Sequence, residues 1–380
     1  MNSLTCRSLE TIRGESVEQL RNKLRENEAI DALFREKRAI VLGAASEGAR
    51  CLSLLESMNF DVIAVVDEGV HVNKIVEGHR VIGLSDLFEK MAPSLPVILC
   101  THRTGGIHRR LSEVGFQLVI PFISLQAAEP GLFPPHEFHD GLLESLVTDF
   151  KQLEWLRDEF SDQLSVKTLD SIIQYRISGN SLVFEDIFQP NLYYVDDLFQ
   201  FSTGEELFID AGAFEGDTIS LFSSYVDGQY KKIVAFEPDP ATFGRLKNNF
   251  FENNNVICIN KGLSHSRSAM RFVSGEQRAS VFSNSGNISV DVTDLDSSLT
   301  ELGLSPTVIK MNIEGFELDA LDGARNTIKE NNPKLFISAY HRPSHLWEVA
   351  RKIKTINPAY NIALRQFDRG LVESVIVAWT

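Results

Sequence analysis

The chain has 380 residues, of which 43% are hydrophobic and 23% are charged, as in typical soluble globular proteins. This length exceeds what one ordinary hydrophobic core accommodates, so we expect two domains. The formal net charge is −15 and Lys and Arg form no cluster, which argues against a basic face and predicts no nucleic-acid partner.

The four cysteines indicate a reducing compartment. Cys6, Cys51, Cys100 and Cys258 are far apart and form no Cys-x-x-Cys pair, so neither zinc nor redox chemistry is expected. Residues 1–20 lack the apolar stretch of a signal peptide, and no segment approaches the roughly 18 apolar residues of a membrane span. These features predict a cytoplasmic protein without a metal site or a membrane span.

The first third of the chain alternates between strand and helix patterns. A charged helix is expected over residues 15–37 and a second helix over 47–58. About four strands are expected, at 39–44, 61–68, 96–102 and 117–123. Such alternation predicts βα units around a parallel sheet, and we assign residues 1–124 to a Rossmann-like N-terminal domain.

A glycine-rich stretch follows the first of these strands. "GAASEG" (43–48) reads Gly-x-Ala-x-x-Gly, and Asp67 ends the next strand, as in a dinucleotide fingerprint. Ala45, however, places a Cβ where a pyrophosphate would need close approach. Two interpretations remain open: the domain binds a nucleotide or nucleotide-sugar, or it has a structural or dimerising role.

Residues 125–205 change pattern and predict a helical connector that packs on the second domain. Apolar residues recur at helical spacing over 142–160 and again over 166–179. The aromatic and acidic stretch 188–201 is expected to form loops and short turns. Its Tyr193 and Tyr194 are candidates to cover a substrate.

Strand and helix patterns alternate again over residues 206–380, the expected second domain. Five strands are expected at 207–212, 232–238, 255–263, 307–315 and 334–341, with a β-rich insert between the third and the fourth. The chain ends in a strand, a tight Asp-Arg-Gly turn and another strand. A turn that short makes a hairpin, so the last strand should run antiparallel to its neighbour.

Polar residues stand where these strands end, which is where parallel sheets bind ligands. Glu237 ends the second strand and can accept both hydroxyls of a ribose. Asp210 precedes Gly212 and Gly216 in the pattern Asp-x-Gly-x-x-x-Gly, whose glycines allow close backbone approach. An acid at that point would repel a pyrophosphate and suit an ammonium group, although Asp210 could instead cap the next helix.

A cofactor with a ribose, an adenine, an α-amino acid and a cationic centre is S-adenosylmethionine. Phe214 and Phe236 flank the loop and could attract its sulfonium through cation–π interactions, or could simply belong to the core. The second domain therefore carries the stronger of the two nucleotide-type sites.

Five stretches of this domain resemble the successive motifs of the FkbM family of methyltransferases: "FIDAGAFEGDT", "VAFEPDP", "NKGLS", "VIKMNIEGFELDALDGA" and "NPKLFISAYHRPSHLWEV". The resemblance covers about residues 206–380. It implies the class I S-adenosylmethionine-dependent fold, whose sheet ends in an antiparallel hairpin. It also implies O-methylation, often of hydroxyls of sugars or natural products.

The resemblance also implies roles for individual residues. Asp210 and Gly212 would meet the methionine part of the cofactor, Glu237 the ribose, and Gly262 and Leu263 the adenine. With their neighbours, the expected cofactor-binding residues are Asp210, Gly212, Phe214, Gly216, Phe236, Glu237, Pro238, Gly262, Leu263 and Asn312.

The chain departs from the family pattern at one position. The family reads Lys-x-Asp-x-Glu-Gly-x-Glu after the fourth strand, and here Asn312 replaces the Asp. Asn keeps an acceptor but loses the charge and the basicity, which puts in doubt any role of that Asp as base or metal ligand.

Three residues are candidates for catalysis. Glu314 and His341 could act as the base for a hydroxyl, and His has the better unperturbed pKa for that task. Glu314 could instead favour the N-terminus of the following helix, and His341 could be an ordinary polar residue at a strand end. Lys310 could hold the acceptor or pair with an acid.

The sequence thus predicts an α/β protein with a class I methyltransferase-type sheet, preceded by a smaller Rossmann-like domain and a helical connector. Its predicted function is S-adenosylmethionine-dependent O-methylation of a small-molecule or sugar acceptor. The alternative is an NAD(P)-dependent or nucleotide-sugar-binding protein that works through the N-terminal domain, with a non-catalytic relic in the C-terminal one. Homo-oligomerisation remains open.

Overall fold

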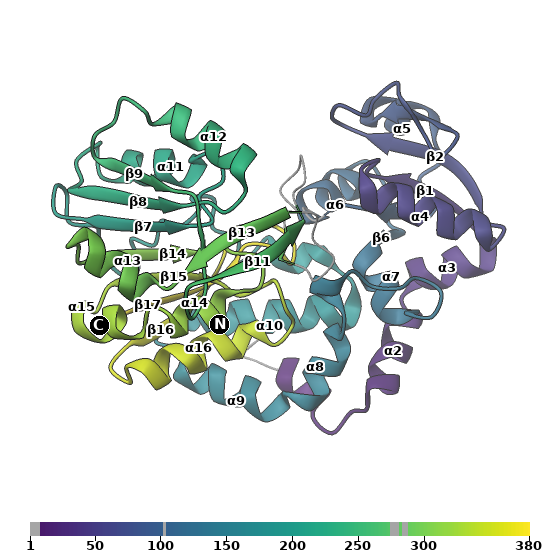
Figure 1. Cartoon of the computed structure of the whole chain (residues 1–380). Helices are drawn as coiled ribbons and strands as arrows, with labels where there is room; N and C mark the ends of the chain where they lie inside the picture. The colour runs from purple at the N-terminus through teal and green to yellow at the C-terminus, as the bar shows by residue number, and fades with distance from the viewer. Residues whose placement is uncertain (1–7, 102–103, 274–280, 283–287) are drawn as a thin grey trace.

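The computed structural model describes residues 8–101, 104–273, 281–282 and 288–380. Two sheets lie at opposite sides of the molecule, with helices of the middle of the chain between and beneath them (Figure 1). Cys6 and the end of the strand predicted at 96–102 lie outside the described residues. Among the helices of the described part, none combines the length and the apolarity that crossing a membrane requires.

The N-terminal sheet has six strands in the order β3-β4-β2-β1-β5-β6. Their bounds are β1 (Arg38–Leu42), β2 (Asp61–Asp67), β3 (Ile75–Val76), β4 (His79–Gly83), β5 (Val97–Leu99) and β6 (Val119–Pro121). All neighbours pair in parallel except β3 and β4, which form a short hairpin at one edge. The prediction of about four strands was therefore too low.

Helices cover this sheet, and two of the predicted boundaries shift. Their bounds are α1 (Ser8–Ile12), α2 (Val17–Arg25), α3 (Glu28–Glu36), α4 (Ser46–Ser57), α5 (Leu84–Lys90), α6 (Thr104–Glu113) and α7 (Phe122–Ala128). The single helix predicted at 15–37 is two helices, because the Asn27 side chain accepts from the Ala29 N–H and starts α3 afresh. The strand predicted at 117–123 stops at Pro121, where α7 begins.

The middle of the chain is helical and contacts both sheets. It contains η1 (Glu137–His139), α8 (Leu142–Thr148), α9 (Phe150–Glu159), α10 (Gln163–Ser178) and η2 (Ser181–Phe184). The helix predicted at 142–160 is interrupted at Asp149. The long helix α10 contacts α1 and α2 as well as β16, so it packs on the N-terminal part too and not on the second domain alone.

The C-terminal sheet has seven strands in the order β16-β17-β15-β14-β7-β8-β9. Their bounds are β7 (Leu207–Ala211), β8 (Lys232–Phe236), β9 (Val256–Ile259), β14 (Val308–Met311), β15 (Lys334–Ser338), β16 (Asn361–Gln366) and β17 (Ser374–Trp379). The strand β17 runs antiparallel to both of its neighbours, which confirms the predicted terminal hairpin. The remaining pairs are parallel.

Helices pack on both faces of this sheet, and a smaller sheet stands beside it (Figure 1). The helices are α11 (Asp217–Tyr225), α12 (Pro240–Asn249), α13 (Leu295–Leu302), α14 (Glu317–Asp322), α15 (Arg325–Asn331) and α16 (His345–Ile356). The predicted β-rich insert is confirmed as a four-stranded sheet of β10 (Gly262–Leu263), β11 (Ser268–Val273), β12 (Val281–Phe282) and β13 (Ile288–Thr293).

One hydrophobic core runs through both halves of the molecule. It includes Leu24 and Val41 from the N-terminal part together with Ile309 and Leu335 from the C-terminal sheet. The helices of the middle segment, with buried residues such as Leu169, join these two ends. The two sheets therefore share apolar packing as well as a covalent link.

Candidate functional site

The carboxyl ends of β7, β8, β14 and β15 meet at one edge of the C-terminal sheet, because these strands are parallel neighbours. The register places Lys310 of β14 opposite Asp210 of β7. Glu237 follows β8, and His341 follows β15. The structure thus brings together the predicted residues that the sequence spreads over more than a hundred positions.

Two glycines of the loop between β7 and α11 are required by contacts within the chain. Gly212 has φ +76°, and a Cβ there would lie 2.0 Å from the Asn312 carbonyl oxygen. Gly216 has φ +91°, and a Cβ there would lie 2.1 Å from the Phe250 ring. The glycines let the loop approach β14 and α12 closely, which fixes the position of its backbone N–H groups.

Asp210 and Lys310 form a buried ion pair. The Lys310 ammonium donates to Asp210 Oδ1 at 2.8 Å and to the carbonyl oxygens of Ala211 and Gly212 at 3.2 and 2.8 Å. Both side chains are buried, at 2% and 0% exposure. Of the two roles considered for Lys310, pairing with an acid is the one that this geometry supports.

The Asp210 carboxylate does not cap the following helix, since Gly216 occupies the N-cap position of α11 without any side-chain bond. Burial raises the pKa of Asp210, and the neighbouring Lys310 ammonium offsets part of that rise. Its second oxygen, Oδ2, is buried and has no hydrogen-bond partner in the described part of the chain.

Glu237 holds the glycine loop in place. Its Oε2 accepts from the Phe214 N–H at 3.0 Å and its Oε1 accepts from the Asp239 N–H at 2.9 Å. Burial raises the pKa of Glu237 to about 7, although the hydrogen bonds from the two N–H groups lower it in part. A carboxylate has about four lone-pair sites, so each oxygen keeps capacity for one further donor, such as a hydroxyl.

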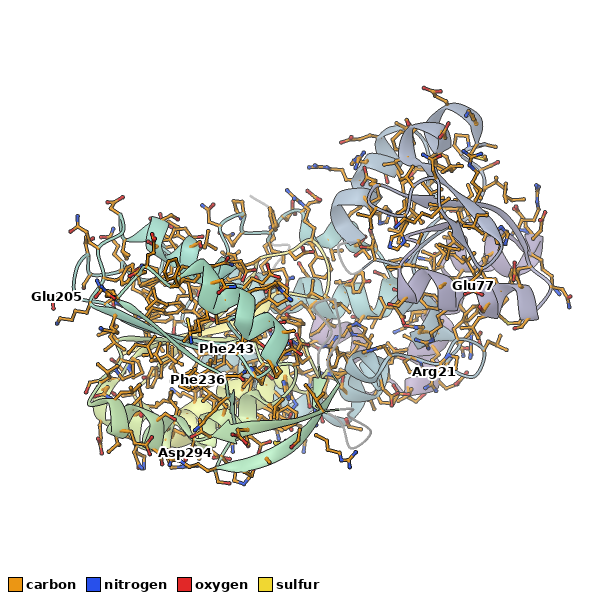
Figure 2. The ribbon with its side chains drawn as sticks, turned by 45° about the horizontal axis from the view of Figure 1, so that its top comes forward. Arg21, Glu77, Glu205, Phe236, Phe243 and Asp294 are labelled. Carbon is orange, nitrogen blue, oxygen red and sulfur yellow. The ribbon has the colours of Figure 1, made fainter. Side chains whose placement is uncertain are left out.

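The other expected cofactor-binding residues lie around this loop. Phe236 is 1% exposed, so its ring belongs to the core, while its carbonyl accepts from the N–H groups of Gly212 and Ala213. Phe214 is half-buried, with φ +50°. Pro238 is half-buried and follows β8. Gly262 and Leu263 are both buried and form β10. Figure 2 labels Phe236 and also Phe243 of α12, which packs against a different hydrophobic cluster from the one that contains Phe236.

Asn312 lies between two tyrosines. Its Oδ1 accepts from the Tyr340 hydroxyl at 3.2 Å, and the Tyr193 hydroxyl approaches it as well. Tyr193 is 6% exposed and packs against Phe336, so it lies beneath this edge of the sheet rather than over it. Tyr194 packs against Tyr225 at 4.8 Å between ring centroids.

Four residues, Glu314, Glu317, His341 and His345, form a carboxylate–histidine cluster at the end of β14 and β15. His341 Nδ1 donates to Glu317 Oε1 at 2.8 Å, and His341 Nε2 lies 3.5 Å from Glu314 Oε2. His345 Nδ1 lies 3.4 Å from the other oxygen of Glu317. His341 and Glu317 are buried, whereas the Glu314 side chain keeps 28% of its surface exposed.

The two acids of the cluster, Glu314 and Glu317, have pKa values shifted in opposite directions. Burial raises the pKa of Glu314 to about 7, although the nearby His341 lowers it. Burial acts on Glu317 in the same direction, but His341 and His345 overcome it and hold the pKa of Glu317 well below its usual range. For His341, burial lowers the pKa and Glu317 more than offsets it, so the pKa is raised.

The sequence prediction missed Glu317 and His345. Glu317 is the last residue of the quoted Lys-x-x-x-Glu-Gly-x-Glu pattern, so its spacing was visible, but not its pairing with His341. His345 begins α16, and only the fold brings it to Glu317. Glu314 has φ +55° and Gly315 has φ +96°, so this turn is held in the left-handed region that few residues favour.

The N-terminal sheet repeats part of this arrangement. Asp67, at the end of β2, accepts from the Ala44 N–H at 2.8 Å and from the Gly69 N–H at 2.7 Å. A Cβ at Gly43 would lie 2.6 Å from the Cys100 carbonyl oxygen, and one at Gly48 would lie 1.8 Å from that of Gly43. Contacts within the chain therefore account for both glycines.

Two hollows adjoin the middle of the molecule. The first, which we call the interdomain cleft, encloses about 430 Å³ with its open mouth included. It is lined by Glu47, Leu99, Cys100, Thr101, Thr104, Phe122, Ile123, Gln126, His139, Tyr175, Leu371 and Val372. It lies where β1 and β5 end, next to the terminal hairpin. The second measures about 260 Å³ and shares His139 and Leu371 with the first.

The two sheets meet at this cleft through the turn of the terminal hairpin. A Cβ at Gly105 of α6 would lie 2.4 Å from the Arg369 carbonyl oxygen, so only glycine admits the turn there. The Arg369 guanidinium stacks on Phe188 at 3.8 Å and pairs with Glu185 at 3.1 Å. No group of three or more His, Cys, Asp or Glu in the described residues could hold a metal ion.

Comparisons with known proteins identify a domain and a fold. Residues 210–367 match the model of the methyltransferase FkbM domain. The crystal structure of a methyltransferase FkbM from Methylobacillus flagellatus KT is similar over 98% of this chain and 97% of that chain. Its TM-score is 0.74 and its identity 22%, so the two share their fold over nearly their whole length.

Other similar structures cover about half of the chain. A fibrillarin from Aeropyrum pernix in complex with S-adenosyl-L-methionine has a TM-score of 0.31 and 12% identity, over 47% of this chain and 67% of that one. A precorrin-6y C5,15-methyltransferase from Geobacter metallireducens GS-15 has a TM-score of 0.30 and 13% identity, over 47% and 82%. No curated protein matches the chain by sequence.

Proposed function

We propose that the chain is a methyltransferase that methylates a hydroxyl oxygen using S-adenosylmethionine, because residues 210–367 match the model of the methyltransferase FkbM domain. We further propose a sugar or a related small molecule as the acceptor. The observation that carries this proposal is Glu314, a partly exposed carboxylate whose pKa of about 7 suits a base for a hydroxyl.

The residues at the edge of the C-terminal sheet fit the cofactor. The two oxygens of Glu237 each keep capacity for one ribose hydroxyl, and the buried pair of Asp210 and Lys310 would hold the Gly212 backbone that faces the methionine part. Gly262 and Leu263 follow β9 and would flank the adenine, with Pro238 and Phe214 at the entrance. When bound, S-adenosylmethionine supplies an electrophilic methyl group on sulfur.

The chain's own residues then orient the acceptor and remove its proton. Glu314 accepts the proton of the acceptor hydroxyl, since it is the exposed member of the carboxylate–histidine cluster. His341 is too buried to reach the acceptor, and we assign it a positioning role: it holds Glu314 and is itself held by Glu317. Asn312, with its neighbouring Tyr340, can donate a hydrogen bond to the acceptor through its amide.

We propose domain boundaries at 1–124, 125–205 and 206–380, with the N-terminal domain as a wall of the acceptor site. The interdomain cleft supports this role, because it lies at the carboxyl ends of the N-terminal strands and reaches the terminal hairpin. We also infer a cytoplasmic protein. Cys51 and Cys100 lie next to each other as free thiols, which fits a reducing compartment.

The Asp67 arrangement favours a second candidate function, the binding of NAD(P) or a nucleotide-sugar at the N-terminal sheet. In both sheets an acid after the second strand accepts from the loop after the first. The two acids can therefore serve as matched variants in one experiment.

Replacing Glu237 with alanine should weaken S-adenosylmethionine binding about 100-fold or more, because two hydrogen bonds to a charged acceptor contribute about 3 kcal/mol together. Isothermal titration calorimetry measures the effect. The Asp67→Ala variant should bind the cofactor like the parent protein. If instead Asp67→Ala loses a nucleotide and Glu237→Ala loses nothing, the second candidate is correct and the first is not.

A further inference from the structure

Arg176 is a buried cation beside the second hollow. It belongs to α10 and is 6% exposed. Its guanidinium donates to Ser145 Oγ at 3.2 Å and to the Pro343 carbonyl oxygen at 3.3 Å, and its buried Nε has no partner in the described part of the chain. Neither of the two acceptors is charged, so the positive charge is not neutralised by contact.

A second buried arginine, Arg365, is neutralised by carboxylates and serves as a comparison. Arg365 is 1% exposed and pairs with Asp162 at 3.3 Å and with Asp197 at 2.6 Å. Arg176 has no carboxylate within 4.0 Å among the described residues. Burial lowers the pKa of Arg176 to about 10, against the more distant Asp149, which shows that the charge is poorly solvated. A buried cation without a partner is costly, and an anion would offset that cost.

The hollow beside Arg176 adjoins the carboxylate–histidine cluster through Tyr340 and Phe138. Its lining includes Phe138, His139, Arg176, Tyr340 and Ser374, and it encloses about 260 Å³ with its open mouth included. Tyr340 donates to Asn312 and precedes His341 in the chain. The His341 ring also packs against Phe138 at 5.5 Å. A group held at Arg176 would therefore belong to a molecule that extends to the carboxylate–histidine cluster.

We propose that the acceptor carries an oxyanion, a carboxylate or a phosphate, and that Arg176 binds it in this hollow. The inference rests on the proposed function and narrows its substrate class from a sugar to an acidic sugar or sugar phosphate. The planar guanidinium presents several N–H donors to the two oxygens of such a group, and bonds between charged partners are about twice as strong as neutral ones.

The rest of the acceptor would extend toward the interdomain cleft, which shares His139 and Leu371 with the hollow. The net charge of −15 repels anions at long range, so recognition must come from the contact at Arg176. Added salt screens that repulsion, while it affects a buried contact less.

Calorimetry with three sugars that share the same ring and differ at C6 tests the proposal. The protein is saturated with S-adenosylhomocysteine and titrated with glucose, glucuronate and glucose 6-phosphate. We expect glucuronate or glucose 6-phosphate to bind at least about tenfold more tightly than glucose, and the better of the two identifies the oxyanion. Arg176→Gln should remove that preference while S-adenosylhomocysteine binds as before.

Two further variants keep the test decisive. Arg176→Lys retains the charge without the planar guanidinium and should retain part of the preference for the anionic sugars. This variant also provides a test if Arg176→Gln does not fold. Arg351→Gln is the matched control, because Arg351 also bridges two helices, through Gln152 and Trp155, but does not line the hollow. It should leave the preference unchanged.

The outcomes separate the two proposals. Equal binding of the three sugars, or an anion preference that survives in Arg176→Gln, overturns the role of Arg176 and leaves the proposed function intact. Failure of the parent protein to bind S-adenosylhomocysteine at all overturns the proposed function itself, and the inference falls with it.

Discussion

Replacing Lys310 with methionine should lower the free energy of unfolding by about 3–5 kcal/mol, the loss expected when one partner of a buried ion pair is removed. The Asp210 carboxylate would remain buried, and its Oδ1 and the Gly212 carbonyl oxygen would lose the ammonium as donor, while the Ala211 carbonyl oxygen keeps the Asn312 N–H. Methionine has a similar length, so the change removes the charge with little change in packing.

The loss should depend on pH. Without Lys310, burial holds the pKa of Asp210 still further above its value in the unfolded chain. An acid whose pKa is raised by folding destabilises the protein as the pH rises through that pKa. The deficit should therefore be larger at pH 8 than at pH 5, where more of Asp210 is neutral.

Urea denaturation followed by tryptophan fluorescence measures this effect, since all three tryptophans, Trp155, Trp347 and Trp379, lie on α9, α16 and β17, which pack at the C-terminal sheet. The double variant Asp210→Asn with Lys310→Met should recover much of the loss, because no charge stays buried. Lys90→Met removes an exposed pair with Asp86 and should leave the midpoint unchanged. A Lys310→Met midpoint equal to that of the parent would contradict the structural role.

Replacing Glu314 with glutamine should lower kcat by about 10²- to 10⁴-fold, the usual contribution of a positioned base. Glutamine keeps the shape and the contact to His341 but cannot accept a proton from a hydroxyl. The affinity for S-adenosylmethionine should stay close to that of the parent protein, because Glu237 and Asp210 are unchanged. The measurement is the rate of S-adenosylhomocysteine formation with a saturating acceptor.

The dependence of kcat on pH tests whether Glu314 is the base. Burial raises the pKa of Glu314 to about 7, so the carboxyl is protonated and inactive below that pH and the parent rate should rise through it. Ionisation of the same group costs folding stability over the same range, because the pKa in the unfolded chain is lower. Activity and stability should therefore change in opposite directions between pH 5 and 8.

Asp319→Asn is the control for this experiment. Asp319 lies in the same region of the chain but is exposed and faces His265 at 3.7 Å. Its substitution should change neither kcat nor the pH profile. If Glu314→Gln keeps both the parent rate and the parent profile, another group removes the proton and the assignment of Glu314 is wrong.

The succession of strands along the second domain, the terminal hairpin and the resemblance to the FkbM family could be read from the sequence, because each depends on local patterns. Apolar runs between turn residues mark β7 and β8, and the short Asp-Arg-Gly turn forces β16 and β17 to run antiparallel. The ends of parallel strands share one edge of a sheet, so Asp210 and Glu237 could be grouped without coordinates.

Pairings between distant residues could not be predicted in the same way. Lys310 had two open roles until the register of β14 and β7 placed it opposite Asp210. His341 had the better unperturbed pKa for a base, but its burial beside Glu317 supports the positioning role that we propose for it. Phe236 and Tyr193 looked like ligand contacts because they are aromatic, and their burial shows that aromatic side chains near a site often complete the core.

Arg176 gave no signal at all in the sequence. It lies among the regularly spaced apolar residues of α10. Only the structure shows that it is buried without a neighbouring carboxylate among the described residues. The helix breaks at Asn27 and Asp149 were also invisible in the apolar periodicity, since the pattern continues across them.

The shared core has a consequence for how the protein responds to heat. Because Leu24, Leu169 and Ile309 belong to one apolar cluster, neither sheet can lose its packing without exposing the other. We therefore expect a single calorimetric transition with equal van't Hoff and calorimetric enthalpies; two resolved peaks would contradict this. The two halves would then melt as one cooperative unit, and a fragment that begins at residue 206 would expose the surface on which α10 packs and would tend to aggregate.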